Sequence, residues 1–464
     1  MALRSKLEVM TPEELEKFHR ASLDILGQKG IVFDDDQALE ILEKGGARIE
    51  GRLAFITEEM VDAALEAAPT RFRHKGLNDE FSITCGEGQY MGAEIGSTKI
   101  MDRKNGLRKG SLEDVTRILK LIQSSPVIDT SAMNPVEPMD IPADKRHLYL
   151  TYEHLKHCHK PFQAYNAIIC PEHAEEIFEM LSLVDDPKTN HLATVSCCPM
   201  SPLKFSGETL QVAMCFARNN QIVHANPAAI VGISAPVNLL GAALQQNVEC
   251  LALLVLIQLV NPGTPFVFAV SSYAGDLRKA SSAWGSPESA ILNTANTQIC
   301  LDKYKIPVRV NCGPTTSKSV DAQSTLETGQ NVMVSYLAGT HLNWAMPGVL
   351  DDVLIYSMEK HIIDEESCAR IKIIAKGMDF SEESLSQAAI MDVEHGGHYL
   401  THPSTMKGFK DRWLPSISNW SGDHEYDIVE QAAHKVEERI NAAPETLLTP
   451  EQDQALRDYI QSKL

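Results

Sequence analysis

Residues 127–133, VIDTSAM, begin a series of short β-rich runs that decides the fold. Each run is bounded by Pro, Gly or Asn, and most are nearly all apolar, which is typical of parallel strands covered on both faces. The six that follow are PFQAYNAII (161–169), HLATVSCC (191–198), QIVHANPA (221–228), PFVFAVSS (265–272), IPVRVNC (306–312) and THLNWAM (340–346). A weaker run, GHYLTH (397–402), is the candidate for an eighth strand.

Helical patterns separate these runs. In residues 171–184, Ala174, Ile177 and Leu181 fall on one face of a helix, whereas Glu175 lies off it. Eight such alternations favour one TIM (β/α)8 barrel over residues 126–415, with its chemistry at the carboxyl ends of the strands. An open doubly wound sheet is the alternative, although no G-x-G-x-x-G loop follows the first strand.

Residues 1–125 are expected to form an N-terminal helical and β-hairpin region that packs on the barrel. Thr11, Pro12 and Glu14 form a capping box that opens a helix. The stretch 81–107 is rich in Gly and β formers, and Asn105-Gly106 is a hairpin turn signal. Residues 416–464 are expected to form a C-terminal helical extension.

Composition limits the partners and the compartment. The formal net charge of -20 argues against nucleic-acid binding, which requires a basic patch. The longest apolar run, 251–260, is too short to span a bilayer, and no secretory leader is recognisable. Ten cysteines without a C-x-x-C pair favour a reducing compartment, so we expect a cytoplasmic protein. The final Ser-Lys-Leu spells a peroxisomal address, but the end of a capped helix is the favoured interpretation.

Four longer strings carry a family resemblance. They are ISAPVNLLGAALQQNVECLALLVLIQLVNPGTPFVF (233–268), GDLRKASSAWGSPESA (275–290), GPTTSKSVDAQ (313–323) and GGHYLTHPSTMKGF (396–409). With them the chain resembles the trimethylamine methyltransferase superfamily, specifically its members that lack pyrrolysine and demethylate quaternary amines.

The resemblance implies a TIM barrel that moves a methyl group from an amine to the cobalt of a corrinoid (cobalamin) on a separate small protein. The chain itself would then bind no cofactor tightly. Members that act on less substituted methylamines carry pyrrolysine in the segment that resembles 313–323. Only standard residues stand there in this chain, with Lys318 the nearest by position. The difference favours a betaine-type donor, namely glycine betaine, proline betaine, carnitine or γ-butyrobetaine.

The chemistry of such a donor predicts the kind of site. A quaternary nitrogen has no N–H, so aromatic faces and diffuse negative charge must recognise it. Loss of a methyl group leaves a neutral tertiary amine, and we therefore assign no catalytic acid or base. Core packing is the alternative role for each aromatic residue near a strand end. These residues are Tyr90, Tyr165, Tyr273, Trp284, Trp344 and Tyr356.

Arg309 is the candidate to bind the carboxylate of a betaine. A charged side chain in an apolar strand is costly unless it is paired, and a guanidinium can hold a carboxylate through two hydrogen bonds. A structural pair with an internal Asp or Glu is the alternative. His341, Asn311 and Asn343 are further substrate-binding candidates, although a lone His in an apolar strand is more often a hydrogen-bonded core residue.

Two groups of residues suggest other interpretations. His224, Cys197 and Cys198 raise the idea of a zinc site, but adjacent cysteines point to opposite faces of a strand, so we predict no metal. Three histidines and a glutamate gather near the last run and are interpreted as structural, with partner docking as the alternative. They are Glu394, His395, His398 and His402.

Two further functions stay open at this point. One is a zinc-dependent corrinoid methyltransferase for an alcohol or a thiol, and the other is a non-enzymatic betaine-binding protein. The main hypothesis predicts a corrinoid-binding protein that docks transiently over the strand carboxyl ends. Whether the chain forms a homo-oligomer is left open.

Overall fold

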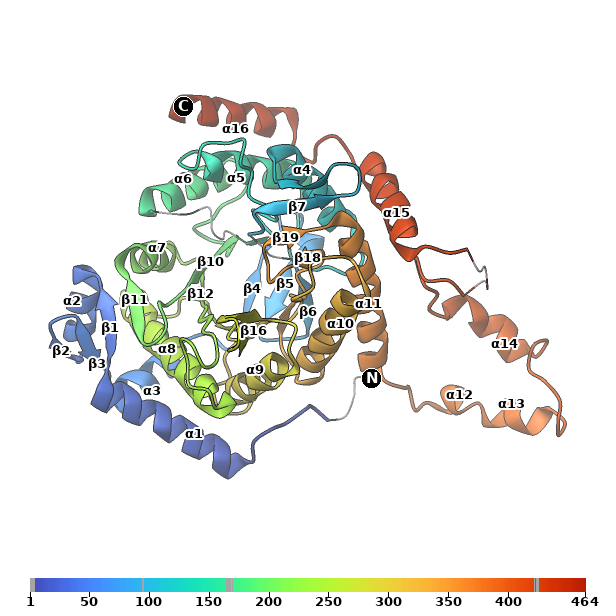
Figure 1. Cartoon of the computed structure of the whole chain (residues 1–464), viewed down its shortest axis with the longest axis horizontal. Helices are drawn as coiled ribbons and strands as arrows, with labels where there is room; N and C mark the ends of the chain where they lie inside the picture. Colours follow the sequence, from blue (N-terminus) through green and yellow to red (C-terminus); the bar gives the residue numbers. More distant parts are fainter. Residues whose placement is uncertain (1–4, 94–95, 164–167, 169, 421, 423–424) are drawn as a thin grey trace.

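The computed structural model describes residues 5–93, 96–163, 168, 170–420, 422 and 425–464 (Figure 1). At its centre, seven parallel strands follow the order β6-β17-β16-β13-β12-β10-β9. Six of them coincide with predicted runs. The seven strands are β6 (Tyr90–Gly92), β9 (Phe162–Gln163), β10 (Ala193–Cys197), β12 (Ile222–Ala225), β13 (Phe266–Val270), β16 (Val308–Asn311) and β17 (Leu342–Trp344).

Residues 128–133 close the ring between β6 and β9. On one side, the Asp129 N–H donates to the Met91 carbonyl at 2.7 Å. On the other side, the Ser131 N–H donates to the Pro161 carbonyl at 3.1 Å. The run VIDTSAM therefore holds the eighth place in the barrel, as a closed TIM fold requires.

The prediction of a barrel strand at 397–402 is wrong. That run lies far from the sheet, is almost wholly exposed, and forms a turn in which the His402 N–H donates to the Tyr399 carbonyl. Its place in the barrel is taken by β6, from the region expected to pack outside. β6 pairs with β17 in parallel, with Tyr90 opposite Leu342. A run of β formers becomes a strand only where a neighbouring strand can pair with it.

Helices surround the barrel. One of them, α8, is long and apolar enough by length and composition to cross a membrane, but 78% of its apolar window is buried, as in a core helix. The helices of the wall are α4 (Leu112–Ser124), α5 (Arg146–His157), α6 (Pro171–Leu181), α7 (Gly207–Arg218), α8 (Leu239–Val260), α9 (Pro287–Ile299), α10 (Ala322–Leu337) and α11 (Met358–Lys376).

The N-terminal region packs on this wall and also closes the amino end of the barrel. The capping box of Thr11 and Glu14 is confirmed at the start of α1. β4 and β5 form a hairpin whose Phe72 and Ile83 pack against Leu342 inside the barrel. The elements of this region are α1 (Pro12–Asp24), β1 (Ile31–Asp34), α2 (Asp36–Lys44), β2 (Arg48–Glu50), β3 (Leu53–Phe55), α3 (Glu58–Ala67), β4 (Phe72–His74) and β5 (Ile83–Cys85).

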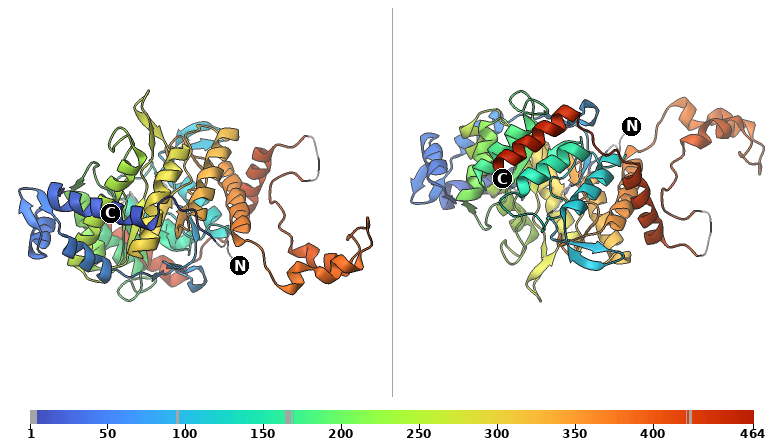
Figure 2. Two further views of the ribbon diagram at one scale, coloured as in Figure 1. Left: turned by 90° about the horizontal axis from the view of Figure 1, so that it is seen from below. Right: turned by 90° about the horizontal axis from the view of Figure 1, so that it is seen from above.

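Short hairpins cover parts of the carboxyl end, and a long segment projects to the side. Figure 2 shows that the chain after α11 leaves the body before it returns to α15. The remaining strands are β7 (Lys99–Asp102), β8 (Gly106–Lys109), β11 (Lys204–Ser206), β14 (Ala274–Asp276), β15 (Ser281–Ala283), β18 (Val349–Leu350) and β19 (Ile355–Tyr356). The remaining helices are α12 (Glu382–Leu385), α13 (Gln387–Asp392), α14 (Pro403–Gly408), α15 (Ile428–Ala442) and α16 (Pro450–Lys463).

Replacing Gly92 by Ala tests the packing inside the barrel. A Cβ at Gly92 would lie 2.1 Å from Cδ1 of Trp344 and 2.9 Å from Oγ1 of Thr130, so one of them must move. We expect G92A to lower the free energy of unfolding by about 1–3 kcal/mol in denaturant titrations. G329A is the matched control, because nothing lies within 4 Å of that Cβ on α10. An equal effect of both changes would contradict this packing.

Candidate functional site

Arg309 is fully buried inside the barrel, at 0% exposure. Its Nη1 donates to Ser196 Oγ and to His224 Nδ1, each at 3.3 Å. Its Nη2 donates to Asn226 Oδ1 and, at 3.2 Å, to Ser271 Oγ. The guanidinium is thereby fixed to β10 and to the carboxyl ends of β12 and β13. Burial and the nearby guanidinium hold the pKa of His224 well below its ordinary value, so its imidazole is neutral and can accept this bond.

The guanidinium of Arg309 also lies flat against Trp344. Its Cζ is 3.4 Å from the centroid of the indole ring, and the centroid of the His224 ring is 5.5 Å from that of the indole. This is the geometry of a cation–π contact between neighbouring strands. Trp344 was predicted to hold the ammonium group of the substrate, but this face of its ring is occupied by Arg309.

Several polar side-chain atoms inside the barrel have no hydrogen-bond partner among the described residues, although each is buried. The Nε1–H of Trp344 and Oγ1 of Thr130 both lie within 3 Å of the Cβ position of Gly92. A buried polar group without a partner costs about 1–3 kcal/mol, so such a group is usually satisfied by a water or a ligand. The atoms are Thr130 Oγ1, Asn134 Oδ1, Gln163 Nε2, Asn311 Oδ1 and Trp344 Nε1.

A second cluster lies in the loops at the carboxyl end. The rings of Tyr273 and Trp284 are stacked, with centroids 4.0 Å apart and planes 25° apart. Beside them, the Asp352 carboxylate accepts hydrogen bonds from Trp284 N–H at 3.2 Å, from Ser282 Oγ at 2.9 Å and from Thr316 Oγ1 at 3.1 Å. Burial, and to a lesser degree Asp351 nearby, raise the pKa of Asp352. Tyr273, Trp284 and Asp352 are called the rim cluster below.

The loop that carries Asp352 is strained. Asp351, Asp352 and Val353 have φ angles of +49°, +51° and +79°, which non-glycine residues rarely adopt in succession. Backbone bonds to the loop after β16 stabilise this conformation, from Asp351 N–H to the Ser317 carbonyl at 2.7 Å and from Asp352 N–H to the Thr315 carbonyl at 2.9 Å. Sequence reasoning missed Asp352, because no pattern around it marks a carboxylate that the fold brings beside two aromatic rings.

Other predicted substrate-binding residues lie elsewhere. Tyr90 and His341 are at the amino ends of β6 and β17, where the Tyr90 hydroxyl accepts from Thr84 N–H and His341 Nδ1 accepts from Val308 N–H. Burial lowers the pKa of His341 to about 4. Asn343 points out of the barrel and accepts from the Ser335 hydroxyl at 2.7 Å. These three residues have local bonding roles, because strand alternation and position direct them away from the carboxyl end.

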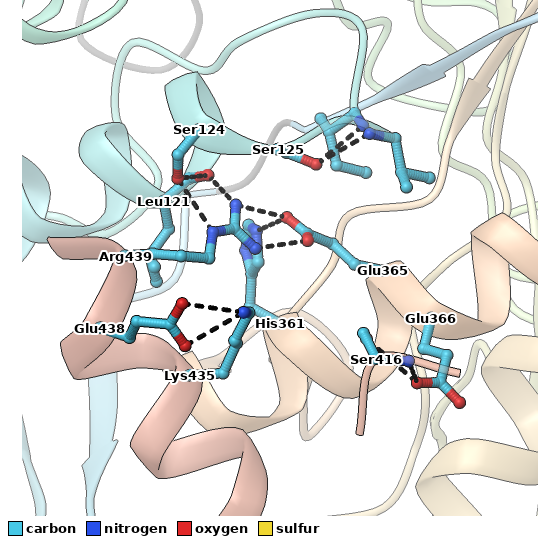
Figure 3. A network of polar contacts seen from close by, with 12 residues as sticks. Leu121, Ser124, Ser125, His361, Glu365, Glu366, Ser416, Lys435, Glu438 and Arg439 are labelled. Carbon is cyan, nitrogen blue, oxygen red and sulfur yellow. Dashed lines mark hydrogen bonds and ion pairs between the residues drawn. The ribbon is translucent and has the colours of Figure 1, made fainter. Parts of the chain in front are cut away.

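Two predicted residues remain, Tyr165 and Tyr356. Tyr165 lies outside the described residues. Tyr356 is fully buried, and its hydroxyl donates to Nδ1 of His361. Figure 3 shows His361 beside Glu365, which also binds Arg439 of α15. Tyr356 therefore belongs to a polar network that joins β19, α11 and α15.

The groups considered for metal binding are dispersed. The Cys197 thiol points toward the Thr209 carbonyl at 3.6 Å, whereas His224 faces Arg309 inside the barrel. Over the part of the chain that the structure describes, no three His, Cys, Asp or Glu side chains are placed to share a metal ion. His402 caps α14, where its Nδ1 accepts from the Ser404 N–H.

Lys318, named above as the residue nearest to the pyrrolysine position, pairs with Asp351 at 3.5 Å.

A closed (β/α)8 barrel with buried polar groups inside and an aromatic, acidic rim at its carboxyl end has the architecture of a barrel enzyme. The family described as Trimethylamine methyltransferase (MTTB) matches residues 3–464. The chain belongs to this family and is a methyltransferase.

The matches to two named relatives cover nearly the full length of this chain. A glycine betaine methyltransferase of Desulfitobacterium hafniense (strain Y51) is 30% identical and covers 100% of this chain and 96% of its own. A proline betaine:corrinoid methyltransferase of Eubacterium limosum is 28% identical, and the match covers 97% of this chain and 96% of the relative. The crystal structure of the Methanosarcina barkeri monomethylamine methyltransferase has a TM-score of 0.52 at 10% identity, covering 100% of this chain and 90% of that one. This last likeness supports the predicted barrel fold.

Replacing Tyr356 by Phe separates a core role from a substrate-binding role. Y356F leaves Nδ1 of His361 without its buried donor, which should cost about 1–3 kcal/mol of unfolding free energy. The Michaelis constant for the methyl donor should stay unchanged in steady-state assays. A raised Michaelis constant at unchanged stability would instead return Tyr356 to the substrate site.

Replacing Asp352 by Asn tests the effect of burial on this carboxyl. Because its folded pKa is raised, ionisation is less favourable in the folded chain than in the unfolded one. The resulting loss of stability is absent below the pKa that Asp352 has in the unfolded chain. It develops as the pH rises from that value through the higher pKa of Asp352 in the folded chain. The melting temperature of D352N should therefore rise relative to the wild type as the pH is raised above about 4. D302N, at an exposed carboxyl, should follow the wild type, and a D352N difference that shrinks with rising pH would contradict the assignment.

Proposed function

We propose that this chain transfers a methyl group from a betaine-type quaternary amine to a corrinoid carried by a separate protein. The observation that carries the proposal is the set of buried polar atoms inside the barrel that also holds Arg309 and Trp344. The Nε1–H of Trp344 and the Nε2 of Gln163 are donors that suit a carboxylate, and the Arg309 guanidinium adds positive charge against the Trp344 ring. The relatives named for glycine betaine and proline betaine support the same class of donor.

The rim cluster suits the other end of such a donor. A quaternary ammonium group is attracted to aromatic faces and to a carboxylate, and it needs no hydrogen bond. Tyr273 and Trp284 present ring surface beside the Asp352 carboxylate, which is already held by three donors and so needs little rearrangement on binding. A betaine carries its carboxylate at one end and its quaternary ammonium group at the other. The buried donors suit the carboxylate, and the rim cluster suits the ammonium group.

The chain's own residues have a positioning role in this reaction. A corrinoid cobalt, when the partner presents it, supplies the nucleophile and accepts the methyl group. As the C–N bond breaks, its electron pair stays on nitrogen and leaves a neutral tertiary amine, so no side chain must donate a proton. The residues need only orient the donor with one methyl group toward the opening and keep water away.

The proposal also covers partner and compartment. A corrinoid protein would approach the carboxyl end of the barrel, where the rim cluster lies. We place the protein in the cytoplasm, because its cysteine pattern suits a reducing compartment. Glycine betaine, proline betaine, carnitine and γ-butyrobetaine all belong to the proposed class of donor.

The assay mixes purified protein, cob(I)alamin and each betaine and follows the absorbance of methylcobalamin. We expect methylcobalamin from at least one betaine and none from trimethylamine, which lacks the carboxylate. W284L should raise the Michaelis constant roughly 2- to 30-fold, since a cation–π contact contributes about 0.5–2 kcal/mol. W420L, at an exposed Trp outside the barrel, is the control and should behave as the wild type.

Two results would contradict the proposal. One is turnover of trimethylamine without turnover of any betaine. The other is a W284L enzyme with an unchanged Michaelis constant, which would remove the rim cluster from the site even if a betaine is demethylated.

A further inference from the structure

Residues 377–412, here called the arm, stand apart from the rest of the molecule. In Figures 1 and 2, α12, α13 and α14 project to one side of the barrel in every view. No residue from 377 to 416 is buried. The arm therefore makes few contacts that could stabilise it within its own chain.

The arm is nevertheless rich in large apolar side chains. Nine of them are 42–80% exposed, which amounts to an apolar surface on the order of 1,000 Å² when each contributes roughly 100 Å². A stable interface needs about 800 Å² from each partner, which an apolar surface of this size can supply. The nine are Met378, Phe380, Leu385, Ile390, Met391, Tyr399, Leu400, Met406 and Phe409.

Internal contacts give the arm a defined shape. Lys407 of α14 pairs with Glu383 of α12 at 2.6 Å, and His402 pairs with Asp392 of α13 at 3.4 Å. These pairs bring the outgoing and returning halves of the arm together. His402 of the GGHYLTHPST motif thus helps to organise the arm itself.

Both ends of the arm are fixed on α11. The outgoing end continues directly from this helix, and the returning end is held where Glu366 accepts hydrogen bonds from Ser416 N–H at 2.9 Å and Ile417 N–H at 2.8 Å. Figure 3 shows Glu366 beside Ser416. The arm is therefore presented outward from a defined position on the barrel wall.

A concave apolar surface lies elsewhere on the same chain, between α1 and the first turns of α8 and α9. Leu240 is 59% exposed there and Ile291 is 41% exposed. We call this surface the groove. Its principal apolar residues are Val9, Phe18, Leu240, Leu244, Ile291 and Leu292.

We propose that the arm of one chain docks its apolar side chains into the groove of a second copy of this chain. The arm projects from the body and the groove is concave, and the arm alone offers the area that a stable interface requires. A corrinoid protein must come and go, and would leave the arm exposed to water between encounters, whereas a second copy can cover it permanently. Reciprocal exchange of two arms closes the assembly with two-fold symmetry and leaves no arm uncovered.

The test is the mass of the full-length protein in solution, measured by light scattering at low micromolar concentration. The wild type should have the mass of a dimer. The arm variant M391D/L400D and the groove variant L240D should each have the mass of one chain, because a carboxylate would be buried in the interface. The control L107D, at a 48% exposed Leu outside both surfaces, should stay dimeric. Circular dichroism should show the same helix content in all four proteins.

Hydrogen exchange links the two surfaces. Amides of residues 377–412 should exchange faster in L240D than in the wild type, although the substitution is on a different part of the chain. A monomeric wild type, a dimer that survives either variant, or an arm whose exchange is unchanged in L240D would each overturn the proposal. Because every readout is independent of methyl transfer, its failure is separate from a failure of the proposed function.

Discussion

The contact between the Arg309 guanidinium and the Trp344 indole is the interaction on which the barrel and its site depend. A buried charge is tolerated only when polar groups surround it, and here Nη1 and Nη2 reach β10 and the ends of β12 and β13 while the flat face rests on Trp344 of β17. One side chain thereby couples five strands. The same constraint explains Gly92, because any side chain at that position would displace the indole from the guanidinium.

The site follows from this packing. With Arg309 and Trp344 fixed, polar atoms of β9, β16, β17 and the closing segment are left facing the interior of the barrel. Such atoms are costly in a folded chain and are usually satisfied by a water or a ligand. The rim cluster above depends on a strained loop, and strain of this kind is commonly found where a side chain must be held in a functional position.

Much of the fold could be predicted from the sequence, because apolar runs and helical periodicity report directly on burial. Six predicted runs became strands of the sheet, and VIDTSAM closes the ring through its backbone bonds. The three-residue strand β6 could not be foreseen, since its pairing with β17 is a long-range contact that leaves no local pattern. GHYLTH was mistaken for a strand for the converse reason: it has β formers but no neighbouring strand.

The site was harder to predict than the fold. Arg309 and Trp344 stood out as unusual residues in strands, but their mutual stacking depends on strand register. Tyr356 and Asp352 show the two ways in which sequence reasoning fails, as an aromatic residue near a strand end can belong to the core and a carboxylate in a loop can belong to the site.

A crystal structure with bound glycine betaine tests the central claim most directly. The account predicts a carboxylate oxygen within hydrogen-bonding distance of Trp344 Nε1 and the trimethylammonium group against the ring surface of Tyr273 or Trp284. A betaine bound outside the barrel, or one that touches neither Trp344 nor the rim cluster, would contradict it.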